Sequence, residues 1–143
     1  MAEVMARVLV AASPEPRAVL ERILAGHDIS SAGDMAEAEQ LLRERTFDLI
    51  ICTVVFDESR MFDLLRFAKA TRNCQSVPFV CARVRRHILR SPTAVKAAAF
   101  TCGALGAQAF LDIEDYALDA DPEQGMHEAI ERLLDAPRVG APL

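Results

Sequence analysis

Short apolar runs alternate with helical patterns along the whole chain, and this alternation restricts the fold more than any other feature. Four runs have the length and composition of buried strands, at residues 7–12, 47–56, 77–82 and 107–111, and residues 27–32 form a short, weaker strand candidate. Apolar residues recur at helical spacing in five further segments, which begin near residues 19, 34, 61, 91 and 121. Such alternation requires crossover connections and a parallel sheet covered by helices on both faces. The sequence therefore predicts a three-layer α/β/α sandwich.

Single residues mark where several of these elements begin or end. Asp34 has the side chain of a helix N-cap, and Pro92 and Pro122 stand at first-turn positions, where a helix tolerates a missing amide hydrogen. Gly26 ends the first helical pattern, and Pro78 stands at the entry of a strand. The strongest strand pattern is the run at 47–56, and a polar stretch follows it.

Length and composition limit the class of protein. The chain has 143 residues, of which 52% are apolar and 26% charged, and this excludes a disordered chain, a collagen-like repeat and a cysteine-dense scaffold. We expect one domain at residues 7–135, with an N-terminal extension at 1–6 and a tail at 136–143 that no output domain follows. Sixteen basic residues against 21 acidic ones give a net charge of -5, which argues against a polycation that coats nucleic acid or an anionic membrane.

The four cysteines show no metal-binding spacing. They stand at positions 52, 74, 81 and 102, without a CxxC pair or a zinc-type Cys/His cluster, and the three histidines are scattered. No signal peptide or membrane-length apolar run is visible, so we expect a cytoplasmic protein with free thiols, no metal and no cofactor. Cys52 and Cys81 lie on strands expected to be neighbours. A redox pair is the alternative to their interpretation as buried apolar residues.

The order of these patterns resembles the receiver domain of two-component response regulators, over about residues 6 to 135. The resemblance rests on four stretches taken together: 7–10, 34–42 with 47–51, 77–80, and 106–111. It implies a flavodoxin-like fold with five parallel strands in the order 2-1-3-4-5. It also implies a role in signalling.

The positions that carry phosphoryl transfer in this family hold unsuitable residues here. The family has two acidic magnesium ligands after the first strand and a phosphoryl-accepting aspartate at the end of the third. A Ser or Thr ends the fourth strand, and a lysine follows the fifth. The matching positions hold Ala12, Ser13, Thr53, Arg83 and Ile113.

The resemblance therefore implies a degenerate receiver that is not an enzyme. A neutral threonine hydroxyl without an adjacent base does not replace a carboxylate nucleophile. Magnesium requires oxygen ligands with negative charge, which Ala12 and Ser13 do not supply. Nothing at these positions stabilises charge on a transferring phosphoryl group.

Other interpretations of the same region stay open. Thr53 is either an ordinary β-branched residue at a strand end or a hydroxyl that contacts a ligand. Asp57 and Glu58 are either solvated loop acids or ligands of a cation. Arg83 is either an exposed loop arginine or one half of an ion pair with Asp57, Glu58 or Glu15. Such a pair would replace the phosphate-centred switch and hold one conformation.

A basic stretch follows the fourth strand. It contains Arg83, Arg85, Arg86, His87 and Arg90, and lies in a connection that is about eight residues longer than in a compact receiver. Loops at the carboxyl ends of parallel strands are favoured binding sites. The stretch is either a docking surface for an acidic partner or a solvated loop. The absence of interleaved aromatic residues argues against nucleic acid.

Two functions from different classes remain. The first is a phosphorylation-independent signalling module whose partner is a histidine kinase, a regulator or a second copy of the chain. In the family, the face of the fourth helix, fifth strand and fifth helix carries such contacts, which implies Lys96, Phe110 and Ala129 together with the basic stretch. The second is a sensor of a small anion that binds among Ala12, Ser13, Thr53 and Arg83.

Overall fold

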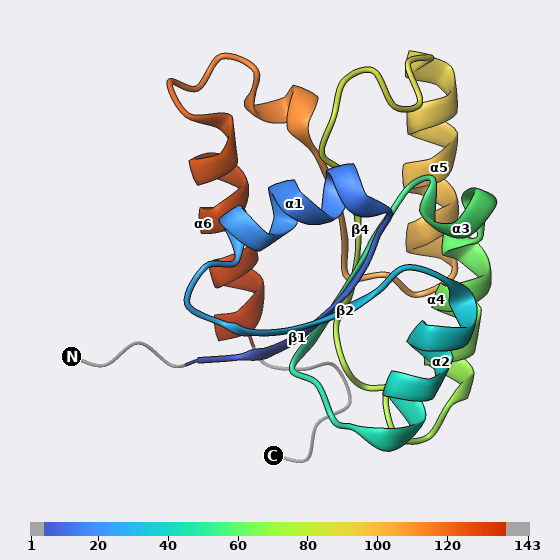
Figure 1. Cartoon of the computed structure of the whole chain (residues 1–143). Coiled ribbons are helices and arrows are strands. Elements are labelled where there is room, and N and C mark those ends of the chain that lie inside the picture. The colour runs from blue at the N-terminus through green and yellow to red at the C-terminus, as the bar shows by residue number, and fades with distance from the viewer. Residues whose placement is uncertain (1–4, 137–143) are drawn as a thin grey trace.

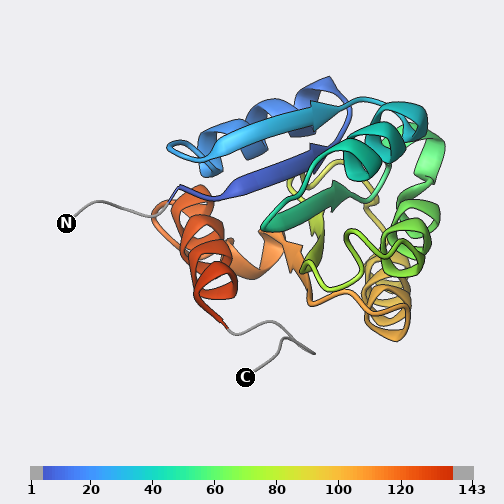
Figure 2. The ribbon, with the colours of Figure 1, turned by 90° about the horizontal axis from the view of Figure 1, so that it is seen from below.

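Five parallel strands form one sheet. The computed structural model describes residues 5–136, and its strands are β1 (Arg7–Ala11), β2 (Asp28–Ala32), β3 (Leu49–Thr53), β4 (Phe79–Arg83) and β5 (Ala109–Asp112). They lie in the order β2-β1-β3-β4-β5, so β2 and β5 are the edges (Figure 2). The predicted flavodoxin-like strand order is confirmed. Most of the predicted N-terminal extension and tail lie outside the described residues.

Helices cover both faces of this sheet (Figure 1). The helices α1 (Pro14–Ile23) and α6 (Pro122–Asp135) lie on one face, and α2 (Met35–Glu44), α4 (Met61–Ala70) and α5 (Pro92–Ala104) lie on the other. Two short turns of helix, α3 (Phe56–Ser59) and the 3-10 helix η1 (Ile113–Tyr116), lie in the connections that follow β3 and β5. The predicted three-layer sandwich is therefore confirmed.

Two cores result from the alternation of side chains along each strand. Leu9, Ile50 and Phe79 pack toward α2 and α4, whereas Val10 and Ile51 pack toward α1 and α6. All five side chains are fully buried. Strands buried on both faces explain why the sequence shows continuous apolar runs rather than an alternation of apolar and polar residues.

The predicted cap Asp34 is confirmed, and Asp121 caps the helix that begins at the predicted first-turn residue Pro122. Asp34 accepts a hydrogen bond from the amide of Glu37 at 2.9 Å, and Asp121 accepts one from the amide of Gln124 at 3.2 Å. Pro92 occupies the first turn of α5, after the N-cap Ser91. These caps satisfy amide hydrogens that the first helical turn leaves without partners.

The predicted strand at 47–56 is too long. Strand β3 ends at Thr53, and Phe56 begins α3 with its ring fully buried in the core. The chain turns through three consecutive residues with positive φ, Asp57, Glu58 and Ser59. The apolar run continues past the strand because Phe56 anchors this turn, which periodicity does not distinguish from a longer strand.

Helix α5 differs from the other long helices in its packing. Only Cys102 is fully buried along its length, and the Phe100 side chain is 78% exposed. Its alanine-rich sequence contains no apolar stripe on one side, so the helix contacts the sheet through few large side chains. It leaves grooves on both of its sides.

Candidate functional site

The residues at the carboxyl ends of the strands form a largely neutral and buried arrangement. Ala12 is fully buried after β1, and Ser13 begins α1 without a capping hydrogen bond from its side chain. Thr53 ends β3, and its Oγ1 is buried without a hydrogen-bond partner among the described residues. Ile113, at the position of the family's lysine, packs partly buried against the core next to α1 and α6. No carboxylate of the described residues takes the place of the family's phosphoryl acceptor.

Arg83 is the most strongly bound charged residue of this region. Its side chain is only 6% exposed, and all three guanidinium nitrogens donate hydrogen bonds. Nη1 donates to Oδ1 of Asp112 at 2.8 Å, Nε to the carbonyl of Ile88 at 2.8 Å, and Nη2 to the carbonyl of Arg86 at 2.7 Å. Oδ1 of Asp112 also accepts the amide hydrogen of Glu114 at 3.0 Å. Arg83 therefore joins β4, β5 and the connection between β4 and α5.

An ion pair of Arg83 was one of the two interpretations of the sequence, but its partner Asp112 was not among the predicted acids. Arg83 and Asp112 are directly opposite each other at the ends of β4 and β5. The predicted partners Asp57, Glu58 and Glu15 are wrong, and so is the alternative of an exposed arginine. The Arg83 side chain is only 6% exposed, so little of it is accessible to a protein partner.

Salt bridges within the chain neutralise most of the basic stretch. Arg85 and His87 lie 3.3 and 3.4 Å from the carboxylate of Glu15, and Arg86 lies 3.0 Å from that of Glu114. Among the described residues, Arg90 has no ion pair or hydrogen bond. The surface of the basic stretch therefore carries less net positive charge than its sequence indicates, because Glu15 and Glu114 lie against it.

The acids after β3 do not converge on a cation. Oδ2 of Asp57 accepts the amide hydrogen of Met35 at 2.9 Å and so helps to cap α2, while Glu58 is exposed. Within residues 5–136, no group of three or more His, Cys, Asp or Glu side chains could hold a metal ion. Asp57 instead acts as a link between the turn after β3 and the start of α2.

A groove between α5 and β5 gathers most of the other predicted docking residues. Its volume is about 580 Å³, and Val95, Ala99 and Phe110 form the apolar part of its lining. Its charged lining residues are Arg83, Arg86, Arg90, Lys96, Asp112, Glu114 and Asp115. We call it the α5–β5 groove. Arg85 lies outside this lining, and Ala129 packs against the core on the opposite face of the sheet.

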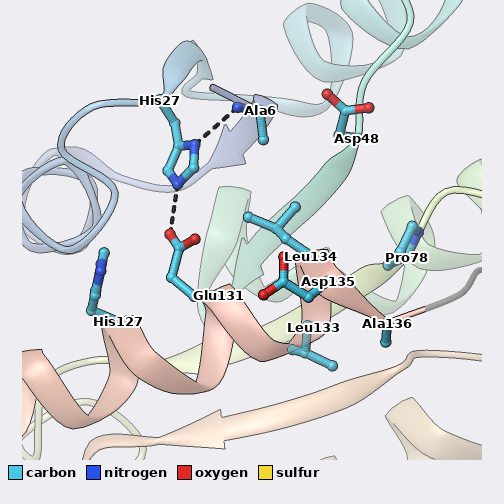
Figure 3. Close-up of a pocket in the computed structure, with 10 residues that line it drawn as sticks. All are labelled: Ala6, His27, Asp48, Pro78, His127, Glu131, Leu133, Leu134, Asp135 and Ala136. Atoms are coloured by element: carbon cyan, nitrogen blue, oxygen red, sulfur yellow. Dashed lines mark hydrogen bonds and ion pairs between the residues drawn. The ribbon is translucent and has the colours of Figure 1, made fainter. Parts of the chain in front are cut away.

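A second cavity lies under α6, near the amino ends of the strands (Figure 3). His27 connects its walls: Nδ1 accepts the amide hydrogen of Ala6 at 3.0 Å, and Nε2 lies 2.6 Å from Oε1 of Glu131. In the neutral ring, Nε2 therefore carries the hydrogen, and this N–H group donates a hydrogen bond to Glu131. His127 is within 2.7 Å of the carbonyl of Ile23. His27 therefore joins the start of β1 to α6, and His127 joins α6 to the end of α1. The sequence patterns gave no indication of this cavity.

The known structures that resemble this chain decide the type of fold. No protein-family model matches the sequence, and no curated protein matches it. The cyanobacterial phytochrome response regulator RcpA, in its phosphorylated form, aligns with a TM-score of 0.72 at 16% identity over 96% of this chain and 100% of its own. The fold is that of a receiver domain.

Two further receiver structures show the same agreement. The chemotaxis response regulator CheY4 of Vibrio cholerae aligns at 22% identity with a TM-score of 0.67, over 91% of this chain and 99% of its own. The receiver domain of a sensor histidine kinase from Pseudomonas aeruginosa aligns at 14% identity with a TM-score of 0.69, over 93% of this chain and 100% of its own. The latter is described with a magnesium ion coordinated in its active-site cleft.

The residues of this chain do not fit that magnesium ion. A receiver fold would hold the metal with carboxylates at the ends of β1 and β3, where this chain has Ala12, Ser13 and Thr53. Magnesium binds charged oxygen ligands in octahedral geometry, and one alanine and two hydroxyls do not supply them. Separately, none of the described helices is long and apolar enough to cross a membrane.

Proposed function

We propose that this chain is a receiver-like signalling module that is not phosphorylated and acts through protein–protein contact. The receiver fold supports a role in two-component or related signalling. The observation that carries the proposal is the buried Arg83–Asp112 pair, which occupies the ends of β4 and β5, where Arg83 stands at the position of the family's Ser or Thr. A cytoplasmic location agrees with this role and is part of the proposal.

The chemistry of the region supports the loss of phosphoryl transfer. A receiver activates its aspartate with a metal ion and a lysine, and here Thr53, Ala12 and Ile113 stand at the matching positions. The Thr53 hydroxyl is buried, has no adjacent base and is not ionised at neutral pH. An acyl phosphate therefore has no carboxylate on which to form.

Arg83 replaces the switch with one fixed conformation. In the proposed module, the guanidinium binds two carbonyls of the connection before α5 and the carboxylate of Asp112 on β5. Charged hydrogen bonds of this kind, inside the protein, are stronger than neutral ones. The position of this connection then no longer depends on a phosphoryl group.

The first experiment tests whether the chain accepts a phosphoryl group. We expect no mass increase after incubation with acetyl phosphate and Mg²⁺, because Thr53 stands in place of the carboxylate nucleophile and no cluster within residues 5–136 could hold a metal ion. CheY4 of Vibrio cholerae serves as a parallel control for the reagents. Acid-stable or acid-labile addition of one phosphoryl group to this chain, mapped to residues 46–60, would contradict the proposal.

The α5–β5 groove is the proposed contact surface. The side chains of Arg90 and Lys96 have no ion pair or hydrogen bond within residues 5–136, and they lie beside apolar Phe110 and Val95 in the groove lining. Exposed cations beside an apolar groove suit an acidic segment that also carries large apolar side chains. A histidine kinase, a regulator or a second copy of the chain can each supply such a segment.

A charge reversal tests this surface with a defined probe. We expect a synthetic amphipathic helix with glutamates and leucines to bind the wild-type protein, and the R90E/K96E double variant to bind it about tenfold more weakly. Titration calorimetry at two salt concentrations measures the effect, which rises as the salt concentration falls. R72E is the matched control, since Arg72 is exposed and does not line the groove. Equal affinities of R90E/K96E and R72E would contradict an acidic partner at this groove.

The structure gives less support to an anion sensor. That hypothesis requires Arg83 to face a ligand beside Thr53, but its guanidinium already makes three hydrogen bonds and points to the α5 side of the sheet. The anion would have to displace Asp112 or act without the arginine.

A further inference from the structure

The connection between β5 and α6 presents an apolar side chain to solvent. Leu118 is 101% exposed, the highest exposure of any large apolar side chain within residues 5–136. The surrounding residues 114–121, which we call the acidic loop, contain no basic residue. The acids of this loop are Glu114, Asp115, Asp119 and Asp121. The loop therefore combines negative charge with one large apolar side chain.

The acidic loop is anchored on α6. The amide of Asp119 donates a hydrogen bond to the carbonyl of Tyr116 at 3.0 Å, and Tyr116 packs partly buried against the core. Gly125, in the first turn of α6, makes this close packing possible. A Cβ atom there would lie 2.6 Å from both Oδ2 of Asp119 and Cδ1 of Tyr116. Because the turn is already fixed, Leu118 contacts a partner with little further loss of conformational entropy.

The α5–β5 groove has the complementary composition. Its apolar lining includes Val95 and Phe110, and its lining also contains Arg90 and Lys96. The side chains of these two cations have no ion pair or hydrogen bond within the described part of the chain. Apart from Asp115, the remaining charged lining residues form two ion pairs with each other: Arg83–Asp112 and Arg86–Glu114. The groove therefore offers apolar surface and two cations without counter-charges.

The groove and the acidic loop adjoin each other on one copy of the chain. Glu114 and Asp115 belong to both, since they line the groove and begin the loop. Leu118 follows three residues later, is not among the lining residues and is fully exposed. The loop thus does not fill the groove of its own copy. Because the two surfaces adjoin, a two-fold axis brings each loop to the groove of a second copy.

We propose that two copies of this chain form a symmetric dimer in which the acidic loop of each occupies the α5–β5 groove of the other. Leu118 contacts the apolar lining, while Asp115 and Asp119 lie beside Arg90 and Lys96 of the other copy. The side chains of Asp115 and Asp119 have no ion pair or hydrogen bond within residues 5–136, so all four charges gain partners. The proposal rests on the proposed function, because it names the partner at the same groove.

Sedimentation velocity of the purified chain tests for this dimer. We expect the sedimentation coefficient to rise with protein concentration toward that of a dimer, and added salt to weaken the association. L118S is expected to weaken it about tenfold, because the leucine side chain is no longer buried in the dimer. M5S is the matched control, since Met5 is 63% exposed and lies outside both the groove lining and the loop.

Two results of this experiment would overturn the dimer. The first is a wild-type chain that stays monomeric at about 1 mM, where even weak specific association is visible. The second is equal association of L118S and M5S, which would show that Leu118 is not at the contact.

An exchange of charges tests which surfaces meet. R90E/K96E gives a copy whose groove and loop both carry acids at the contact, and D115K/D119K gives a copy in which both carry bases. Each variant alone is expected to be monomeric, because like charges face each other. Their equimolar mixture is expected to form a one-to-one heterodimer, because each groove then faces a loop of opposite charge. A mixture that stays monomeric would contradict the pairing. All four side chains are exposed, so circular dichroism is expected to show an unchanged fold.

The synthetic acidic helix separates a failure of the dimer from a failure of the proposed function. If the wild-type chain is monomeric and still binds the helix more tightly than R90E/K96E does, the dimer is wrong and the groove takes a different acidic partner. If the chain neither associates nor binds the helix, the proposed contact surface is wrong as well. If the dimer forms, the helix competes with the loop, so L118S is expected to bind the helix more tightly than the wild-type chain does.

Discussion

Replacement of Arg83 by alanine is expected to lower the free energy of unfolding by about 3–5 kcal/mol, because it leaves the Asp112 carboxylate buried without its counter-charge. The side chains of Arg83 and Asp112 are 6% and 11% exposed, so water does not replace the lost partner without a change of structure. The variant also removes the donors that hold the carbonyls of Arg86 and Ile88. Urea unfolding measures the loss, and amide exchange at residues 84–90 is expected to accelerate.

Two comparisons separate this effect from a general cost of arginine removal. R86A removes an exposed ion pair with Glu114 and is expected to cost at most about 1 kcal/mol. The R83M/D112L double variant replaces both charges by apolar groups, so it is expected to recover much of the stability lost in R83A. If R83A were no less stable than R86A, the pair would not hold the connection before α5. If R83A does not fold, the double variant still provides the test.

The fold was predictable because its information is local and repeated. Continuous apolar runs such as the one at 49–52 report strands buried on both faces, and the caps Asp34 and Asp121 mark helix starts. The strand order is different: periodicity does not contain it, and it came from the resemblance to receivers. The predicted strand extended wrongly over residues 54–56 because periodicity does not distinguish an apolar residue that anchors a turn from an apolar residue of a strand.

The site was only partly predictable because it depends on contacts between distant segments. An ion pair of Arg83 was one of the two interpretations of the sequence, but its acid lies at the end of the next strand, 29 residues later. A signal for this pair existed: both residues end neighbouring parallel strands, and the register places them opposite each other. Salt bridges such as Arg85–Glu15 neutralise the basic stretch, and sequence proximity does not reveal them. The orientation of α5 was also hidden, since an alanine-rich helix has no stripe that selects its buried side.

Replacement of Thr53 by valine is expected to raise the free energy of unfolding by about 1–2 kcal/mol, since a buried hydroxyl without a partner carries a desolvation cost. Thr53 is 2% exposed, and its Oγ1 has no hydrogen-bond partner among the described residues. Valine keeps the β-branched shape that suits a strand and replaces the hydroxyl by a methyl group at the end of β3, where Thr53 is paired with Ala82 of β4. In a protein that used this position for phosphoryl or ligand chemistry, the same change would remove a working group.

Thr71→Val is the matched control for this change. Oγ1 of Thr71 donates to the carbonyl of Phe67 at 2.7 Å, so its loss is expected to lower the free energy of unfolding by about 1 kcal/mol. The two identical substitutions should therefore have opposite signs in urea unfolding. A loss of stability in T53V similar to that in T71V would show that the Thr53 hydroxyl binds an ordered water or an anion. That result would favour the ligand-sensing function over the interaction module, because the carboxyl ends of β1 and β3 would then still form a polar site.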